Sequence, residues 1–307
     1  MKDKLKLIGQ KLLFLLKKLG IRVGKDTLFF IIRCFEFCIL IFGIIFFIKW
    51  SNNSLIITEV DYINTNLPSS FNDFKILQIS DVNGKDIGKE LVEKTNELNP
   101  DIIVFTGDYI NASRTTEYTI DTYYFENIKK PIYFIPGEQE LDSLIYEELK
   151  NKLKSYNVII LDNNSDIIIK GQDNIEILGI NDTSFFIENI NEVDKKIAEL
   201  KNENRFQILL SHRPELIDIY TKNDIPLVLS GHALGGQIRL PFVGAIYSSN
   251  QGFYPDYTSG FYKQNNTTLY VSRGIGNTFI PIRLFNRPEI NLITLKNKEI
   301  INENITN

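Results

Sequence analysis

The chain has 307 residues, of which 43% are hydrophobic and 23% are charged. This length suits one globular domain with an appendage, or two small domains. The net charge of −4 is unevenly distributed: residues 1–50 carry ten basic and three acidic residues, which leaves 24 basic against 35 acidic residues in 51–307. Nucleic-acid binding requires basic surface, so an acidic body argues against nucleic acid as the main partner.

The first element in chain order is a predicted membrane helix. Residues 28–48 form an apolar run of 21 residues, which is about 31 Å long as a helix and matches the core of a bilayer. Arg33 and Glu36 interrupt it, and at a spacing of three they share a helical face and can pair. Because Lys49 and Trp50 provide an interfacial end, we predict a transmembrane helix over residues 28–50. The alternatives are a hydrophobic core helix of a soluble protein and a cleaved signal peptide.

The flanking charges predict the orientation of this helix. Eight basic residues precede Leu28, and the next one after Lys49 is Lys75. The positive-inside rule then places the N-terminus in the cytoplasm and the main domain outside it, in a single-pass protein of the cell membrane. Residues 1–27 are predicted as a basic cytoplasmic segment, with an amphipathic helix over 5–19 on the inner leaflet.

Residues 51–307 are predicted to form one α/β domain, because short apolar runs alternate with amphipathic stretches. Continuous apolar strands indicate sheets that are covered on both faces. The predicted helices are 86–99, about 140–156 and about 188–202. The predicted strands are 55–62, 74–80, 101–106, 131–135, 158–161, 166–170, 175–180, 206–211, 226–230, 237–240, 269–272 and 289–295.

Five predicted strands are followed by side chains that can bind a metal. They are Asp81, Asp108, Glu138, His212 and His232, and the last two are the only histidines in the chain. Sites in α/β folds lie at the carboxyl ends of strands. Each residue alone has a plainer explanation as a helix cap, turn former or loop histidine, but the repeated placement favours a site. Carboxylates combined with imidazoles suit Mn, Fe or Zn better than Ca or Mg.

Short motifs around these residues resemble those of a known family. They are SDVN at 80–83, TGDYI at 106–110, PGEQE at 136–140, SHRPE at 211–215 and SGHALGGQIRLP at 230–241. In this order they resemble the calcineurin-like metallophosphoesterases, most closely the membrane-associated bacterial branch, and residues 270–290 resemble the end of that branch. The resemblance covers about residues 55–295. It implies an αββα two-sheet sandwich with a two-metal site at one end.

Four positions depart from the family pattern. Asn83, Gln139 and Leu234 stand where the family has histidines, and Glu138 stands where it has an asparagine. The resemblance implies that one metal set becomes Asp81, Asn83, Asp108 and Leu234, which has lost two nitrogen ligands. It implies that the other set becomes Asp108, Glu138, His212 and His232, all of which can ligate. We therefore expect one divalent ion (Mn, Fe or Zn), with two ions as the alternative.

These losses predict a change of activity. A two-metal phosphoesterase clamps the attacking and leaving oxygens between its ions, and Gln139 cannot donate a proton at a useful pKa. We predict a membrane-anchored protein of this fold with lost or strongly reduced phosphoester hydrolysis, which binds a phosphorylated or lipid-linked ligand. One alternative is an active metal-dependent phosphoesterase with a remodelled site, acting on a phosphomonoester, phosphodiester or lipid headgroup. Another is a structural envelope protein with a vestigial pocket.

Aromatic residues gather in one long loop after the last motif. They are Tyr247, Phe253, Tyr254, Tyr257 and Tyr262. They are candidates for a lid or a binding surface, and the alternative is the ordinary packing of a long loop.

Overall fold

A computed structural model describes residue 18 and residues 24–116, 119–182, 190–248, 251–277 and 282–301. The chain divides between Trp50 and Ser51 into two units. Except for Lys18, the predicted amphipathic segment 5–19 lies outside the described residues.

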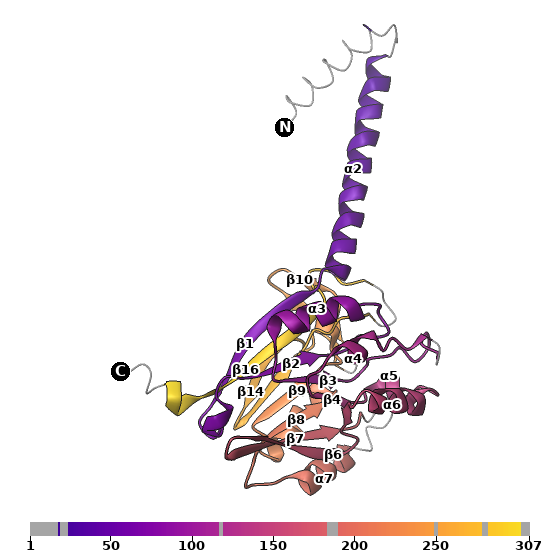
Figure 1. Cartoon of the computed structure of the whole chain (residues 1–307). Coiled ribbons are helices and arrows are strands. Elements are labelled where there is room, and N and C mark those ends of the chain that lie inside the picture. Colours follow the sequence, from indigo (N-terminus) through magenta and orange to yellow (C-terminus); the bar gives the residue numbers. More distant parts are fainter. Residues whose placement is uncertain are drawn as a thin grey trace. The chain divides into compact units, whose positions relative to one another are not determined.

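Helix α2 (Lys25–Asn53) contains the apolar run (Figure 1). Its portion Phe29–Asn53 is long and apolar enough to cross a membrane, and in the described part of the chain no other helix meets that criterion. Apart from Arg33 and Glu36, apolar residues recur around the whole circumference of Phe29–Ile48, so this is not an amphipathic surface helix. Arg33 Nη1 lies 3.0 Å from Glu36 Oε2, so the predicted pairing of these two charges is confirmed.

The second unit is built on two six-stranded sheets that pack face to face (Figure 1). Sheet A has the spatial order β1 (Ile56–Asn64), β16 (Glu289–Asn297), β2 (Phe74–Ile79), β3 (Ile102–Thr106), β4 (Ile132–Ile135) and β5 (Ile159–Ile160). Sheet B has the order β14 (Gly260–Gln264), β15 (Thr267–Val271), β9 (Leu227–Ser230), β8 (Phe206–Ser211), β7 (Asp173–Ile180) and β6 (Asn164–Lys170). Strands β2–β5 are mutually parallel, and so are β7, β8, β9 and β15.

Helices cover the outer face of each sheet. Helices α3 (Gly88–Leu98), α4 (Tyr123–Asn127) and α6 (Tyr146–Ser155) pack on sheet A, and α7 (Ile190–Leu200) and α8 (Ile217–Lys222) pack on sheet B. The period-two alternation of strands explains how both faces are apolar: in β2, Ile76 points into the core between the sheets and Leu77 points to the helices. The predicted αββα sandwich is therefore confirmed. Short elements complete the body: α5 (Glu138–Leu141), η1 (Ser69–Phe71), η4 (Pro214–Leu216) and η5 (Leu234–Gly236).

The prediction of one helix over residues 140–156 is wrong. The segment forms α5 and α6, with a break at which Ser143 Oγ accepts a hydrogen bond from the Ile145 N–H. Serine often competes with helical backbone bonds in this way.

The long aromatic loop is more regular than predicted. It forms the two-residue strand pairs β10 (Arg239–Leu240) with β11 (Gly244–Ala245), and β12 (Tyr247–Ser248) with β13 (Gly252–Phe253). Such short strands leave no periodic pattern in a sequence. The Tyr257 and Tyr262 rings pack together against the core outside sheet B, whereas Phe253 and Tyr254 are largely exposed. The loop therefore contributes both to core packing and to the surface.

Candidate metal centre

Six strand ends, three from each sheet, deliver polar side chains to one end of the sandwich. The parallel strands β2, β3 and β4 are followed by Asp81, Asp108 and Glu138, and β7, β8 and β9 are followed by Asp182, His212 and His232. Carboxyl ends of parallel strands meet at one sheet edge, which is why residues distant in sequence converge here. The structure thus brings together all five residues singled out from the sequence and adds Asp182.

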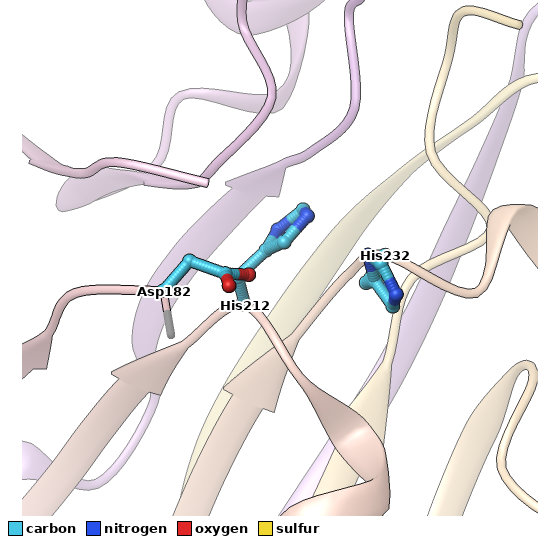
Figure 2. A group of neighbouring side chains, drawn as sticks. All are labelled: Asp182, His212 and His232. Carbon is cyan, nitrogen blue, oxygen red and sulfur yellow. The ribbon is translucent and has the colours of Figure 1, made fainter. Parts of the chain in front are cut away.

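Two groups of side chains have the geometry for a metal ion. One consists of Asp81, Asp108 and His212, and the other of Asp182, His212 and His232; within each group the potential ligand atoms lie within 4.8 Å of one another, and all are buried. Figure 2 shows the second group, with both imidazoles and the carboxylate on neighbouring strand ends of sheet B. Glu138 lies beside it, with Oε2 3.9 Å from Nδ1 of His232. His212 belongs to both groups, so it is the centre of the cluster.

The ring of His212 is oriented as a metal ligand usually is. Its Nδ1 lies 2.7 Å from the Thr106 carbonyl oxygen, which can only accept, so Nδ1 carries the proton. Nε2 then faces Asp108, 3.4 Å from Oδ2. A backbone carbonyl that fixes the tautomer in this way is the common outer partner of metal-bound histidines.

The two sheet A aspartates are fixed by short hydrogen bonds. Ser80 Oγ donates to Asp81 Oδ2 over 2.6 Å, and the His232 N–H lies 3.1 Å from both Asp81 carboxylate oxygens. The Gln139 N–H donates to Asp108 Oδ1 over 2.9 Å. Asp81, Asp108 and His232 all have left-handed backbone, with φ of 50°, 56° and 65°. Such conformations are uncommon for residues other than glycine, although Asp and His tolerate them better than most, and they concentrate at functional sites.

Glu140 holds the backbone of the loops that carry Asp108 and Gly137. It is fully buried and accepts hydrogen bonds of 2.8, 2.9 and 2.8 Å from the N–H groups of Asp108, Ile110 and Gly137. Burial, with the Asp108 charge adding to it, raises the pKa of the Glu140 carboxyl to about 7. Glu140 therefore holds the turn that carries Asp108, and its position behind the backbone gives it no part in either ligand group.

Burial and mutual repulsion make this cluster ready to accept a cation. Burial, together with the Asp108 charge, raises the pKa of Glu138 to about 7 and that of Asp81 to about 6. Burial opposes charge on His212, but the Asp108 carboxylate outweighs it and raises the His212 pKa well above its usual value. Burial and the neighbouring His212 hold the His232 pKa well below its usual value. The metal-free cluster thus retains protons that a cation would displace.

Arg213 is an unpredicted member of the site. Its Nε donates to Asp182 Oδ1 over 2.7 Å, and its Nη2 lies 3.3 Å from Glu138 Oε2. The guanidinium is nine-tenths buried and connects carboxylates from both sheets. No pattern in the sequence identifies this role, because Asp182 and Glu138 are 31 and 75 residues away.

Two buried atoms test whether these residues fit a metal. Oδ2 of Asp182 is buried and has no hydrogen-bond partner among the described residues, and Nε2 of His212 makes no hydrogen bond there beyond its 3.4 Å ion-pair contact with Asp108. Unpaired buried polar atoms are costly and rare, and a cation would satisfy both. The mixture of imidazole nitrogen and carboxylate oxygen suits Mn, Fe or Zn. The residues present therefore fit a divalent ion.

The three positions at which histidine was expected from the resemblance are also in the structure. The Asn83 side chain is buried, and neither of its amide atoms has a hydrogen-bond partner in the described part of the chain. Gln139 turns its Oε1 to the Ala112 N–H, at 3.1 Å. Leu234 is buried, and its carbonyl oxygen accepts a hydrogen bond of 2.8 Å from Asn286.

The chain belongs to the calcineurin-like phosphoesterase family, whose sequence model matches residues 74–235, more than half of its length. It is 31% identical over 256 residues to the uncharacterized metallophosphoesterase YkuE of Bacillus subtilis, which covers 78% of this chain and 85% of that protein. It is also 31% identical to the uncharacterized metallophosphoesterase Cj0846 of Campylobacter jejuni, over 86% of this chain and 70% of that one. Members of this family bind divalent metals, and the buried Asp and His groups described above are plausible positions for them.

Two more distant similarities are to proteins from Danio rerio. A transmembrane protein with metallophosphoesterase domain from Danio rerio is 28% identical over 78% of this chain and 57% of its own length. Among solved structures, a dimetal phosphatase from Danio rerio aligns with a TM-score of 0.45 at 11% identity, over 73% of this chain and 99% of that one.

Proposed function

We propose that this protein is a membrane-anchored, metal-binding member of the family whose phosphoester hydrolysis is lost or strongly reduced, and that it binds a phosphorylated or lipid-linked ligand. The orientation of Gln139 is the observation that carries this proposal. Its side-chain Oε1 accepts a hydrogen bond from the Ala112 N–H, and its backbone N–H donates to Asp108 Oδ1. The side chain at the family's proton-donor position is thus neutral, and it is engaged in holding the loop.

The metal set that we propose comprises Asp108, Glu138, His212 and His232, on the basis of the His212–Asp108 and His232–Glu138 contacts. Asp182, which groups with both histidines, can contribute through Oδ2. Asp81 is the remaining candidate; it is held by Ser80 and by the His232 N–H. A bound divalent ion supplies a positive charge that polarises a phosphoryl oxygen. Arg213, between Asp182 and Glu138, adds a fixed positive charge beside it. The proposed metal set and Arg213 can together bind a phosphate group. They include neither a second metal set nor a proton donor with which to cleave it.

Location at the cell membrane is part of the proposal. Helix α2 has the length and composition of a membrane span. Eight basic residues before Leu28, with none between Lys49 and Lys75, support a cytoplasmic N-terminus and an extracytoplasmic main domain. A single-pass anchor would restrict the domain to ligands near the bilayer surface.

A second candidate function is an active phosphoesterase with a remodelled site. The Asn83 amide favours it, because both of its polar atoms are buried without a partner among the described residues, two positions from Asp81. An amide oxygen can ligate a hard cation in place of an imidazole. In this alternative, Asp81 and Asn83 hold a second ion and the substrate is a phosphomonoester, a phosphodiester or a lipid headgroup.

Metal content and turnover of the full-length protein in detergent distinguish these functions. We expect about one Mn, Fe or Zn per chain, as a single intact ligand set implies, and no hydrolysis of bis(p-nitrophenyl) phosphate above that of Asp108→Asn. Robust hydrolysis that Asp108→Asn removes would establish the active enzyme instead. Absence of metal, with no change in stability for His212→Ala, would indicate a vestigial pocket.

A further inference from the structure

Exposed apolar side chains concentrate on three adjacent segments of the body. We call them the apolar rim: Leu240, Phe242, Val243, Phe253, Tyr254 and Phe285. Backbone hydrogen bonds join the segments, from Arg239 N–H to Leu284 oxygen, from Ile246 N–H to Ile238 oxygen and from Tyr254 N–H to Ile246 oxygen. The rim is therefore one local unit and not a set of scattered side chains, which would need no explanation.

Three aromatic residues of the rim occupy costly backbone conformations: Phe285, with φ of 51°, and the two that are most exposed. Phe242 and Tyr254 have φ of 68° and 54°, in the left-handed region that bulky residues avoid. Both side chains face outward: Phe242 is fully exposed, and Tyr254 is 70% exposed. Burial within the fold therefore does not offset this cost. Strain of this kind, together with exposed aromatic surface, points to a partner outside the chain.

The rim is tied to the residues that directly follow the apolar run of α2. Asn52 Oδ1 accepts a hydrogen bond of 2.8 Å from the Arg283 N–H, and Asn52 Nδ2 donates to the Arg283 oxygen over 3.2 Å. The next residue, Leu284, forms a bridge with Ile238 at the base of the rim. Asn52 is four residues after Ile48, a chain distance of at most about 14 Å. A bilayer that held the apolar run would therefore have Asn52, which bonds the segment carrying Phe285, within this chain reach.

The sequence around the rim is basic, as expected of a surface that binds an anionic membrane. Residues 237–255 and 270–288 contain four arginines and no Asp or Glu, whereas residues 51–307 as a whole carry 35 acidic residues. An anionic lipid surface would repel most of this acidic body. Arg239, Arg273 and Arg287 are partly exposed, whereas Arg283 is buried. Apolar tips beside partly exposed arginines are the composition of an interfacial binding surface.

We propose that the apolar rim inserts into the interfacial region of an anionic lipid bilayer and docks the domain on the membrane that anchors it. This inference rests on the membrane anchoring in the proposed function, and it requires neither a bound metal nor hydrolysis. Asn286 of the same segment binds the Leu234 carbonyl, two residues from His232. Docking through the rim would therefore fix the metal centre relative to the bilayer and favour lipid-borne ligands over soluble ones.

Tryptophan quenching tests the inference, because the chain has a single tryptophan, Trp50. Full-length protein is reconstituted into vesicles of phosphatidylcholine and phosphatidylglycerol with brominated acyl chains, which quench only indoles that contact them. Phe242→Trp and Leu144→Trp are each made in a Trp50→Phe background. Leu144 is the matched control, because it is also fully exposed but lies between α5 and α6.

We expect the emission of the Phe242→Trp variant to fall by roughly half, as for a side chain about 5–10 Å into the headgroup–acyl boundary. The Leu144→Trp variant should be unaffected. Equal quenching of both variants, or quenching of neither, overturns the docking surface; the latter result would leave a protein partner as the occupant of the rim. Trp50 in the unaltered protein reports on anchoring separately: its quenching without that of Phe242→Trp supports the anchor and refutes only the rim.

Discussion

Arg213 Nε donates a 2.7 Å hydrogen bond to Asp182 Oδ1, and the two side chains are 10% and 0% exposed. The same guanidinium lies 3.3 Å from Glu138. In the metal-free protein, the positive charge at this end of the sandwich therefore comes in part from Arg213. Removing one partner of a buried ion pair leaves an uncompensated charge, which costs more than the pair contributes.

We expect Arg213→Met to destabilise the metal-free protein by about 3–5 kcal/mol, or a fall of roughly 10 °C in Tm. Saturating Mn should restore most of this loss, because the cation takes over neutralisation of the two carboxylates. Thermal unfolding of the full-length protein in detergent, with and without Mn, measures both effects. Arg205→Met is the control. The Arg205 guanidinium lies 3.8 Å from Glu176, and the Arg205 side chain is 32% exposed. Removal of the Arg205 charge should therefore cost less than about 1 kcal/mol. Equal losses for the two variants would contradict the role given to Arg213.

A second prediction concerns the turn that presents Asp108. A Cβ added to Gly137 would overlap the Asp108 carboxylate oxygen Oδ1 and lie 2.6 Å from the Asp108 nitrogen. We therefore expect Gly137→Ala to displace Asp108 and to abolish metal binding. Metal content after purification in excess Mn is the measurement. Gly171→Ala should lose stability because Gly171 has a φ of 63°, but it should keep its metal, because Gly171 lies in the β6–β7 turn. Metal retained in Gly137→Ala would exclude Asp108 as a ligand.

The pH dependence of stability should differ between the metal-free and metal-bound forms. Carboxyls with raised folded pKa stabilise the fold below their unfolded pKa, about 4, and this contribution is lost as pH rises through the folded values, about 6 for Asp81 and about 7 for Glu138. The His212 pKa is also raised, which acts in the same direction near neutral pH. The His232 pKa is lowered, so its contribution is lost as pH falls below about 6.5 and opposes the others.

The metal-free protein should accordingly lose stability between pH 5 and pH 8, and excess Mn should remove or reverse this trend because bound metal requires deprotonated ligands. Tm measured across this range with chelator and with Mn checks both parts. Glu138→Gln should flatten the metal-free profile. A metal-free Tm that rises steadily from pH 5 to 8 would show that these carboxyls are not protonated in the fold.

Asp182 shows how far sequence reasoning reaches at this site. The strand before it, β7, was predicted, and the placement of Asp182 after that strand is the same signal that identified Asp81 and Asp108. The sequence around it, Asn181-Asp182-Thr183-Ser184, is also typical of an ordinary turn. For this reason Asp182 was not distinguished from a turn former. Strand-end position can thus be predicted from apolar periodicity, but the choice between a turn former and a ligand depends on which strands are neighbours.

The contacts of Arg213 and Gln139 lay beyond prediction for a different reason. Arg213 meets Asp182 because β7 and β8 are adjacent and parallel, and it meets Glu138 because the two sheets face each other. The Gln139 side chain turns to Ala112, in the loop after β3. Long-range contacts of this kind follow from strand order, which local patterns do not encode.

Restoring the three histidines is the strongest test of lost hydrolysis. Leu234 has a φ of 49°, which is unfavourable for leucine and better tolerated by histidine, so Leu234→His adds no backbone strain. Asn83→His provides a second imidazole beside Asp81, and Gln139→His provides a group that can donate a proton. Because general acid catalysis alone contributes about 10²–10⁴-fold, we expect the triple variant with Mn to hydrolyse bis(p-nitrophenyl) phosphate at least about 100-fold faster than the unaltered protein.

The gain must depend on the cluster and not on a contaminating enzyme. Asp108→Asn added to the triple variant should remove it, because Asp108 contacts His212 and lies in the group with Asp81. Gln139→His alone should give little, since it restores the proton donor without the second set of nitrogen ligands. If the unaltered protein already matches the triple variant, the existing residues suffice for catalysis and the remodelled enzyme is the correct description. If the triple variant binds two metals and still fails to turn over, the loss of activity lies outside these three positions.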